Sequence, residues 1–218
     1  DKMTGRPIEI TIGLYQERDF SKPVAEQTIK IDKIQYNKYE ATLDVGEYEG
    51  RATFAVKVPS TRSIGLDLVS LMPADNIKGW RRDVIETIKS NNLPLPIMRF
   101  PGGCYASFYD WKDGIGDPFY RPVELNSFWN NPVMNDMGTV EFVELCRETK
   151  TVPMFCVPLM FKPIETTLDW VSFCNAPNHS LRAKYGHPEP LNVKYWELDN
   201  EMYRRYDAIT YANKCVEY

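Results

Sequence analysis

The feature that most constrains this chain is a regular alternation of helical and strand patterns after Pro73. Apolar residues recur at helical spacing in four segments, residues 79–92, 138–150, 166–175 and 208–218. Short apolar runs that suit strands lie between them, at residues 95–100, 151–161 and 192–200. Strands that alternate with helices predict an α/β fold with a parallel sheet, which is either doubly wound or part of a (β/α)8 barrel. Periodicity alone leaves both architectures open.

Residues 1–72 show a different pattern, because no helical period occurs there. Five short β-rich runs are separated by Pro, Gly, Asp and Lys: PIEITIGLY, EQTIKID, YEATLDVG, RATFAVKV and SIGLDLVSL. This spacing predicts a small all-β sandwich or jelly roll. We therefore expect two domains, residues 1–72 and residues 73–218. The segment between residues 101 and 135 is expected to be a long loop.

Composition excludes several classes of function. The net charge is −4, from 26 basic and 30 acidic residues, which disfavours nucleic-acid binding. No run of about 18 apolar residues is present, so no membrane span is expected. Five dispersed cysteines and two histidines disfavour a zinc site or a disulfide framework. The sequence also lacks GxGxxG and P-loop motifs, so a nucleotide site has no support. We expect neither a metal nor a cofactor.

Polar residues follow two of the predicted strands. The first strand runs into PGGCYASFYDW, and the third ends in Asp199, Asn200 and Glu201. Both candidate architectures place their chemistry at the carboxyl ends of strands. A partly buried Glu201 suits a general acid, and Asn200 suits a sugar hydroxyl. Two simpler interpretations stay open: Pro-Gly-Gly is a common turn sequence, and Glu201 is simply an N-cap or first-turn acid of the next helix.

The chain from Asp67 onward resembles glycoside hydrolase family 51, the α-L-arabinofuranosidases of clan A. The stretches that carry the resemblance occur in the family's order: LDLVSLMPADN, GWRRDVIETIK, MRFPGGCYASFYDWKDGIGDPFYRP and GHPEPLNVKYWELDNE. The resemblance implies a (β/α)8 barrel with accessory β-domains. Residues 73–218 would supply strands two to four of that barrel. Residues 1–72 would be part of a carbohydrate-binding-like sandwich.

The resemblance also implies roles for individual residues. Glu201 would be the general acid/base, and Asn200 would bind the 2-hydroxyl of the sugar. The remaining substrate-binding residues implied by the family pattern are Cys104, Trp129, Asn135 and Asp136. Two positions depart from that pattern. Asp136 is one methylene shorter than the family's Glu, and Asp199 replaces a Gly. Because strand residues alternate sides, we expect Asp199 to point away from the pocket.

The implied activity is that of a retaining, exo-acting hydrolase that releases terminal α-L-arabinofuranose. Its substrates would be arabinan, arabinoxylan or their oligosaccharides. A retaining enzyme needs a second carboxyl group as nucleophile, which the family carries on its seventh strand. We find no such strand here. The expectation is an internal fragment that is inactive alone and is completed by a second chain or by missing segments.

Alternative functions also fit the sequence. One alternative is a non-catalytic carbohydrate-binding or assembly module, and another is a different clan A glycosidase that acts on xylan or β-glucan. A doubly wound binding domain is a further alternative, without a nucleotide motif to support it. A polysaccharide substrate favours an extracellular or periplasmic location, and uptake of oligosaccharides would also allow a cytoplasmic one.

Overall fold

The computed structural model describes residues 6–90 and 96–218. The chain divides into two compact units, residues 1–74 and residues 75–218. The predicted helix end at Asn91 and Asn92 lies outside the described residues. None of the helices in the described part of the chain has both the length and the apolar character needed to cross a bilayer.

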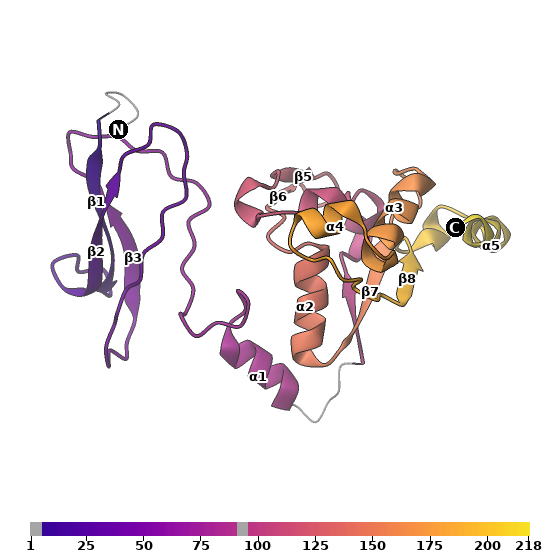
Figure 1. Cartoon of the computed structure of the whole chain (residues 1–218), viewed down its shortest axis with the longest axis horizontal. Coiled ribbons are helices and arrows are strands. Elements are labelled where there is room, and N and C mark those ends of the chain that lie inside the picture. Colours follow the sequence, from indigo (N-terminus) through magenta and orange to yellow (C-terminus); the bar gives the residue numbers. More distant parts are fainter. Residues whose placement is uncertain (1–5, 91–95) are drawn as a thin grey trace. The chain divides into compact units, whose positions relative to one another are not determined.

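The first unit contains an antiparallel sheet of three strands in the order β2-β1-β3 (Figure 1). These strands are β1 (Ile8–Gln16), β2 (Pro23–Ile31) and β3 (Ala52–Lys57). They confirm three of the five predicted runs. Residues 39–46 and 63–71, also predicted as strands, form no regular strand. A β-rich composition favours a pleated, half-buried surface and forms a strand only where a neighbour offers backbone partners.

The second unit contains a parallel sheet of three strands in the order β4-β7-β8, which confirms the predicted parallel pairing. The strands are β4 (Ile97–Phe100), β7 (Val152–Val157) and β8 (Tyr195–Leu198). Each is shorter than the apolar run that predicted it. Phe100 lies opposite Phe155, and Val157 lies opposite Leu198. The carboxyl ends of all three strands therefore meet at one edge of the sheet.

The described part of the second unit contains five α-helices: α1 (Arg82–Ser90), α2 (Thr139–Thr149), α3 (Ile164–Asn175), α4 (Ser180–Lys184) and α5 (Ala208–Glu217). All but the five-residue α4 were predicted. Helix α2 begins at a close backbone contact, because a Cβ on Gly138 would lie 1.9 Å from the carbonyl oxygen of Gly114. Only glycine fits there. The Gly138 N–H donates to Glu141 Oε2 at 2.9 Å, which satisfies a backbone donor at the helix start.

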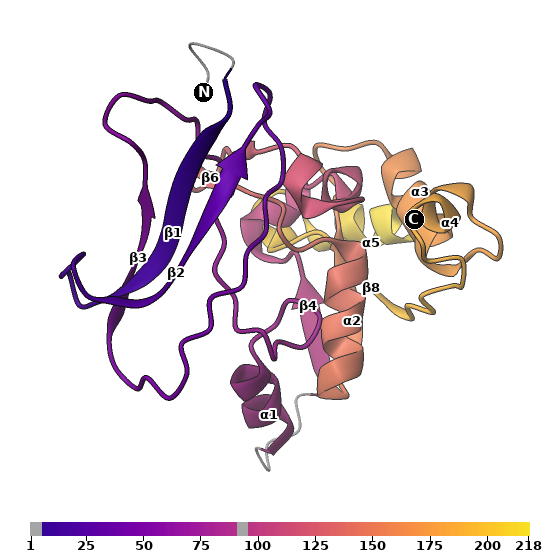
Figure 2. The same ribbon diagram turned by 60° about the vertical axis from the view of Figure 1, so that its left-hand side comes forward.

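The core of the second unit joins one face of the parallel sheet to α2 and α3, and Figure 2 shows α2 beside β4. The predicted apolar face of α2 is confirmed, since Phe142, Val143, Leu145 and Cys146 are all buried. Phe155 and Trp170 lie at the centre, with ring centroids 4.8 Å apart. The core cluster contains Phe100, Tyr109, Trp111, Val140, Phe142, Val143, Cys146, Phe155, Val157, Trp170, Phe173, Cys174, Leu191 and Val193.

Residues 101–135 form more structure than the predicted loop. They contain three 3₁₀ helices and a hairpin: η1 (Gly103–Ser107), η2 (Trp111–Gly114), η3 (Pro118–Tyr120), β5 (Glu124–Asn126) and β6 (Asn131–Val133). Side chains stabilise these turns locally. Asp110 accepts from the Lys112 N–H at 3.1 Å, and Asp117 accepts from the Phe119 N–H at 3.0 Å. Such contacts leave no periodic pattern in the sequence, so the prediction of a plain loop was wrong.

Candidate active site

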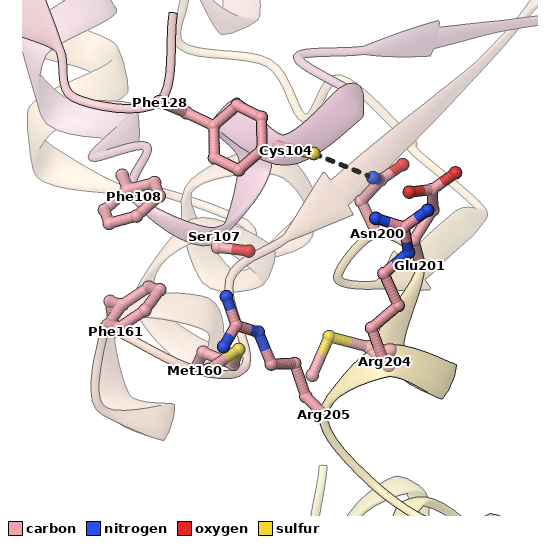
Figure 3. A pocket seen from close by; sticks show the side chains of 11 residues that line it. Cys104, Ser107, Phe108, Phe128, Met160, Phe161, Asn200, Glu201, Arg204 and Arg205 are labelled. Atoms are coloured by element: carbon pink, nitrogen blue, oxygen red, sulfur yellow. Dashed lines mark hydrogen bonds between the residues drawn. The ribbon is translucent and has the colours of Figure 1, made fainter.

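A pocket of about 320 Å³ lies at the carboxyl edge of the parallel sheet (Figure 3). Its walls come from the segments that follow β4, β7 and β8, together with Phe128 from the β5–β6 hairpin. The lining residues are Cys104, Ser107, Phe108, Phe128, Met160, Phe161, Asn200, Glu201, Met202, Arg204 and Arg205. Parallel strands bring these segments together although they are about a hundred residues apart in the sequence.

Three of the predicted site residues meet in this pocket: Cys104, Asn200 and Glu201. The amide nitrogen of Asn200 lies 3.8 Å from Cys104 Sγ, within the range of a sulfur hydrogen bond. This contact joins the loop after β4 to the end of β8.

Arg99, on β4, fixes the orientation of Asn200. Its Nη2 donates to Asn200 Oδ1 at 2.8 Å, and its Nε pairs with the Glu197 carboxylate of β8. The same guanidinium contacts Cys156 Sγ at 3.6 Å. Burial, with Glu197 nearby, raises the pKa of the Cys156 thiol to about 12. We did not predict a role for Arg99. The alternation of side chains along Met98, Arg99 and Phe100 does place Arg99 on the other face of the strand from the buried Phe100.

Asp199 is buried and is not among the residues that line the pocket. Its carboxylate accepts from the Ser107 hydroxyl, from the Leu159 N–H at 2.9 Å and from the Met160 N–H at 3.2 Å. The Asn200 N–H also donates to it, at 2.7 Å. One carboxylate therefore ties the segments after β4, β7 and β8 together, a role that we did not predict.

The backbone explains how Asp199 reaches these donors. Its φ is 60°, in the left-handed region, so β8 has already ended and simple strand alternation does not apply. Glycine adopts this conformation without steric cost, and Asp tolerates it better than most residues.

Glu201 is exposed and is the one carboxylate among the residues that line the pocket. It precedes a short 3₁₀ helix, η4 (Met202–Arg204), and its side chain forms no capping hydrogen bond there. The next helix, α5, is capped instead by Asp207, which accepts from the Thr210 N–H at 2.9 Å. Glu201 therefore occupies the N-cap position of η4 without a capping hydrogen bond from its side chain.

The other three predicted site residues lie outside the pocket lining. Trp129 is 63% exposed and packs edge-to-face on Phe128, with ring centroids 5.0 Å apart. Asn135 is buried, and its amide donates to the Pro122 carbonyl at 2.8 Å. Asp136 is exposed. Their roles as sugar ligands stay predictions.

The pocket has two chemically different walls. Phe108 and Phe161 stack nearly parallel on one side, with centroids 4.4 Å apart and an interplanar angle of 11°. The other side carries Asn200, Glu201 and the Arg204 side chain, and the Arg205 guanidinium points toward Ser107 and Met160. Within residues 6–90 and 96–218, no cluster of three or more His, Cys, Asp or Glu side chains has the arrangement of a metal site. The pocket thus offers an apolar surface beside hydrogen-bonding and charged groups.

Comparison of the chain with known proteins identifies its family. Residues 89–218 match the model of the alpha-L-arabinofuranosidase 1 domain. The probable alpha-L-arabinofuranosidase C of Aspergillus flavus is 37% identical over 135 residues, which cover 60% of this chain and 26% of that protein. The intracellular exo-alpha-(1->5)-L-arabinofuranosidase of Halalkalibacterium halodurans is 34% identical over 134 residues, with the same shares covered.

A solved structure agrees with these relatives. The family 51 α-L-arabinofuranosidase of Thermotoga petrophila superimposes with a TM-score of 0.61 and is 38% identical. The match covers 67% of this chain and 32% of that chain, and it supports the α/β fold. The present chain spans about a quarter of the length of the curated relatives it matches. It belongs to the alpha-L-arabinofuranosidase 1 domain family, the glycoside hydrolases of family 51.

Proposed function

We propose that this chain carries the acid/base half of the active site of a retaining, exo-acting α-L-arabinofuranosidase. The observation that carries the proposal is the pairing of Asn200 and Glu201 in one pocket at the carboxyl edge of the parallel sheet. In this proposal, β4, β7 and β8 are strands two to four of a (β/α)8 barrel. The antiparallel sheet of the first unit belongs to a carbohydrate-binding-like sandwich.

The proposed chemistry begins with Glu201 in its protonated form. It donates a proton to the glycosidic oxygen as the bond to the terminal arabinofuranose breaks. A second carboxyl group attacks the anomeric carbon from the opposite face and forms a covalent glycosyl intermediate. Glu201, now ionised, then removes a proton from the water that releases the sugar. The Asn200 amide, oriented by Arg99, binds the 2-hydroxyl throughout.

The second carboxyl group must lie about 5–5.5 Å from Glu201. Glu201 has no such partner among the lining residues, so the proposal assigns the nucleophile to residues outside this sequence, in the same protein or in a second chain. Cys104 is proposed to contact the terminal sugar directly. Trp129, Asn135 and Asp136 are proposed to reach it in the completed barrel.

The substrates in this proposal are arabinan, arabinoxylan or their oligosaccharides. The name of the Halalkalibacterium halodurans relative describes exo-action on α-(1->5)-linked arabinofuranose, and its 34% identity supports the same mode here. Exo-action also agrees with a pocket of modest volume, about 320 Å³.

A substitution of Glu201 in the assembled protein tests the proposal. With Glu201→Gln, we expect hydrolysis of an alkyl arabinofuranoside to fall by about 10²–10⁴-fold, because its leaving group needs a proton. For a dinitrophenyl arabinofuranoside, the rate of the first step should fall far less, because its leaving group needs no proton. Azide should restore turnover of that substrate and yield the arabinosyl azide, because it attacks the intermediate without a base.

Glu189→Gln is the matched control, since Glu189 is exposed and does not line the pocket. It should leave both substrates unaffected. Equal losses with good and poor leaving groups, without azide rescue, would reject the acid/base role. Binding of arabinose oligosaccharides without turnover in the assembled protein would instead favour the non-catalytic module.

A further inference from the structure

Two arginines give the pocket a positive charge that the proposed hydrolysis of a neutral sugar does not use. Arg204 and Arg205 follow β8 by way of η4, and both side chains line the pocket. Figure 3 shows the Arg204 guanidinium directed toward Asn200 and Glu201, and that of Arg205 toward Ser107 and Met160. The pocket thus holds two cationic groups and one carboxylate, that of Glu201, and only the Arg204 guanidinium lies beside this carboxylate.

Neither arginine is committed to another acidic side chain. Within residues 6–90 and 96–218, no carboxylate lies within ion-pair distance of either guanidinium. Arg204 instead lies 5.7 Å from the centroid of the Tyr203 ring. Asp207, the nearest acid in the sequence besides Glu201, is bonded to the backbone N–H and the hydroxyl of Thr210. Asp199 is buried and bonded to Ser107 and to backbone N–H groups. The guanidinium groups are therefore available to an anionic ligand.

The opposite wall defines the shape of that ligand. Phe108 and Phe161 stack on each other, and Phe128 and Met160 extend the same apolar surface. Sugar rings present C–H faces that pack on aromatic rings, whereas inorganic anions gain nothing from such a wall. A planar guanidinium matches a carboxylate with two parallel hydrogen bonds. The ligand that uses both walls is a sugar ring that carries a carboxylate.

We propose that this pocket includes a subsite for a uronic acid residue, bound through its carboxylate by Arg204 and Arg205 beside the Phe108–Phe161 wall. The inference rests on the proposed function insofar as the uronate would neighbour the arabinofuranose in the substrate. Binding of the acidic sugar itself does not depend on hydrolysis. The enzyme would then prefer arabinose side chains attached to acidic polysaccharides over those on neutral ones.

Calorimetric titration of the full chain with matched sugars tests the subsite. Methyl glucuronoside and methyl galacturonoside are compared with methyl glucoside and methyl galactoside, so each pair differs only at the carboxylate. We expect at least one uronoside to bind roughly tenfold more tightly than its neutral partner. The preference should weaken in high salt, because the arginines are exposed. Which uronoside prevails distinguishes glucuronate side chains from a galacturonate backbone.

The double variant Arg204→Gln, Arg205→Gln should abolish that preference. Arg18→Gln is the charge-matched control, because Arg18 is exposed and lies in the first unit. Circular dichroism should show that each variant folds like the parent chain, and Arg204→Lys, Arg205→Lys provides a second variant that keeps the charge. Equal affinity for uronosides and neutral sugars in the parent, or phosphate binding as tight as uronoside binding, would overturn the subsite.

Turnover measurements separate this inference from the proposed function. One outcome is that the assembled protein hydrolyses aryl arabinofuranosides and that uronosides bind no more tightly than neutral glycosides. The subsite is then wrong and the proposed activity stands. If the chain binds uronosides selectively and the assembled protein has no arabinofuranosidase activity, the subsite stands and the proposed hydrolysis is wrong.

Discussion

The two units each contain a sheet of three strands, but the two sheets differ in strand direction and in how they are covered. In the first unit, β1 pairs antiparallel with both neighbours, and the buried apolar side chains are few: Ile8, Ile10 and Tyr15. In the second unit, the strands are parallel and one face is covered by α2 and α3 over an aromatic core. Parallel strands require long connections, and these bring distant segments to one edge. The candidate site lies at that edge.

The difference shows how buried polar groups are used. The second unit buries Asp199 and Arg121, each held by several hydrogen bonds. The described acidic side chains of the first unit are all exposed or half-buried. A buried charge needs a rigid set of donors or acceptors, which the layered core provides. The same rigidity is what a binding pocket requires.

The largest expected effect is the loss of a core aromatic from the second unit. Phe155→Ala should destabilise this unit by about 3–5 kcal/mol, because Phe155 is fully buried at the centre of the core. All five tryptophans lie in residues 75–218, so their fluorescence during urea unfolding reports this unit alone. Val152→Ala, at an exposed position of the same strand, should cost much less. Equal losses of stability in the two variants would contradict the distinction between a buried core position and an exposed strand position.

Next in size is the removal of the Asp199 charge. Asp199→Asn should cost about 1–3 kcal/mol, because an amide group replaces one acceptor oxygen that faces buried N–H donors. Urea unfolding followed by tryptophan fluorescence measures the loss. Asp136→Asn, at an exposed position, is the control and should be nearly neutral. A neutral Asp199→Asn would mean that the carboxylate is not what holds the three segments together.

A smaller effect is expected from a polar contact of the first unit. The Tyr15 hydroxyl donates to Glu26 Oε2 at 2.8 Å, and Tyr15→Phe should cost about 0.5–1.5 kcal/mol. The loss is limited because the Glu26 side chain, 42% exposed, can return to water. Far-UV circular dichroism should register the change while the tryptophan transition stays in place. A shifted tryptophan transition would show that the two units unfold as one.

The smallest effects are pH slopes of opposite sign in the two units. In the first unit, hydrogen bonds from Ser21 lower the pKa of Asp19 to about 2, so its stabilisation is lost as pH falls from about 4 through that value. In the second unit, burial raises the pKa of Asp113, with Asp110 and Glu124 nearby. That contribution is present at low pH and is lost as pH rises through the raised pKa.

The parent chain should lose stability at acid pH through Asp19, and Asp19→Asn should not show this loss. The parent chain should also lose stability above about pH 4 through Asp113, and Asp113→Asn should not show that loss. Unfolding curves at pH 2.5, 4 and 6 for both variants measure these slopes. Slopes of the same sign would contradict the assigned environments.

The sequence by itself determined most of the regular elements. Helices α2 and α3 and the parallel strands were predicted because apolar residues with the right period must face a core. The pocket members Cys104, Asn200 and Glu201 were named from the ends of predicted strands and from the family resemblance. Two strands of the first unit were predicted wrongly, since a β-rich run does not reveal whether a neighbour exists to pair with it.

Only the tertiary structure decided how the site is held and what charge it carries. Asp199 is bonded to Ser107, Leu159 and Met160, and Arg99 orients Asn200, through contacts between residues 39 to 101 positions apart. The fold also places Arg204 and Arg205 in the pocket lining, where the sequence left both a surface role and a role in binding a carboxylate open. Local periodicity reports which side of an element is apolar. Contacts between distant segments depend on the packing of whole elements, and no short stretch of sequence records that.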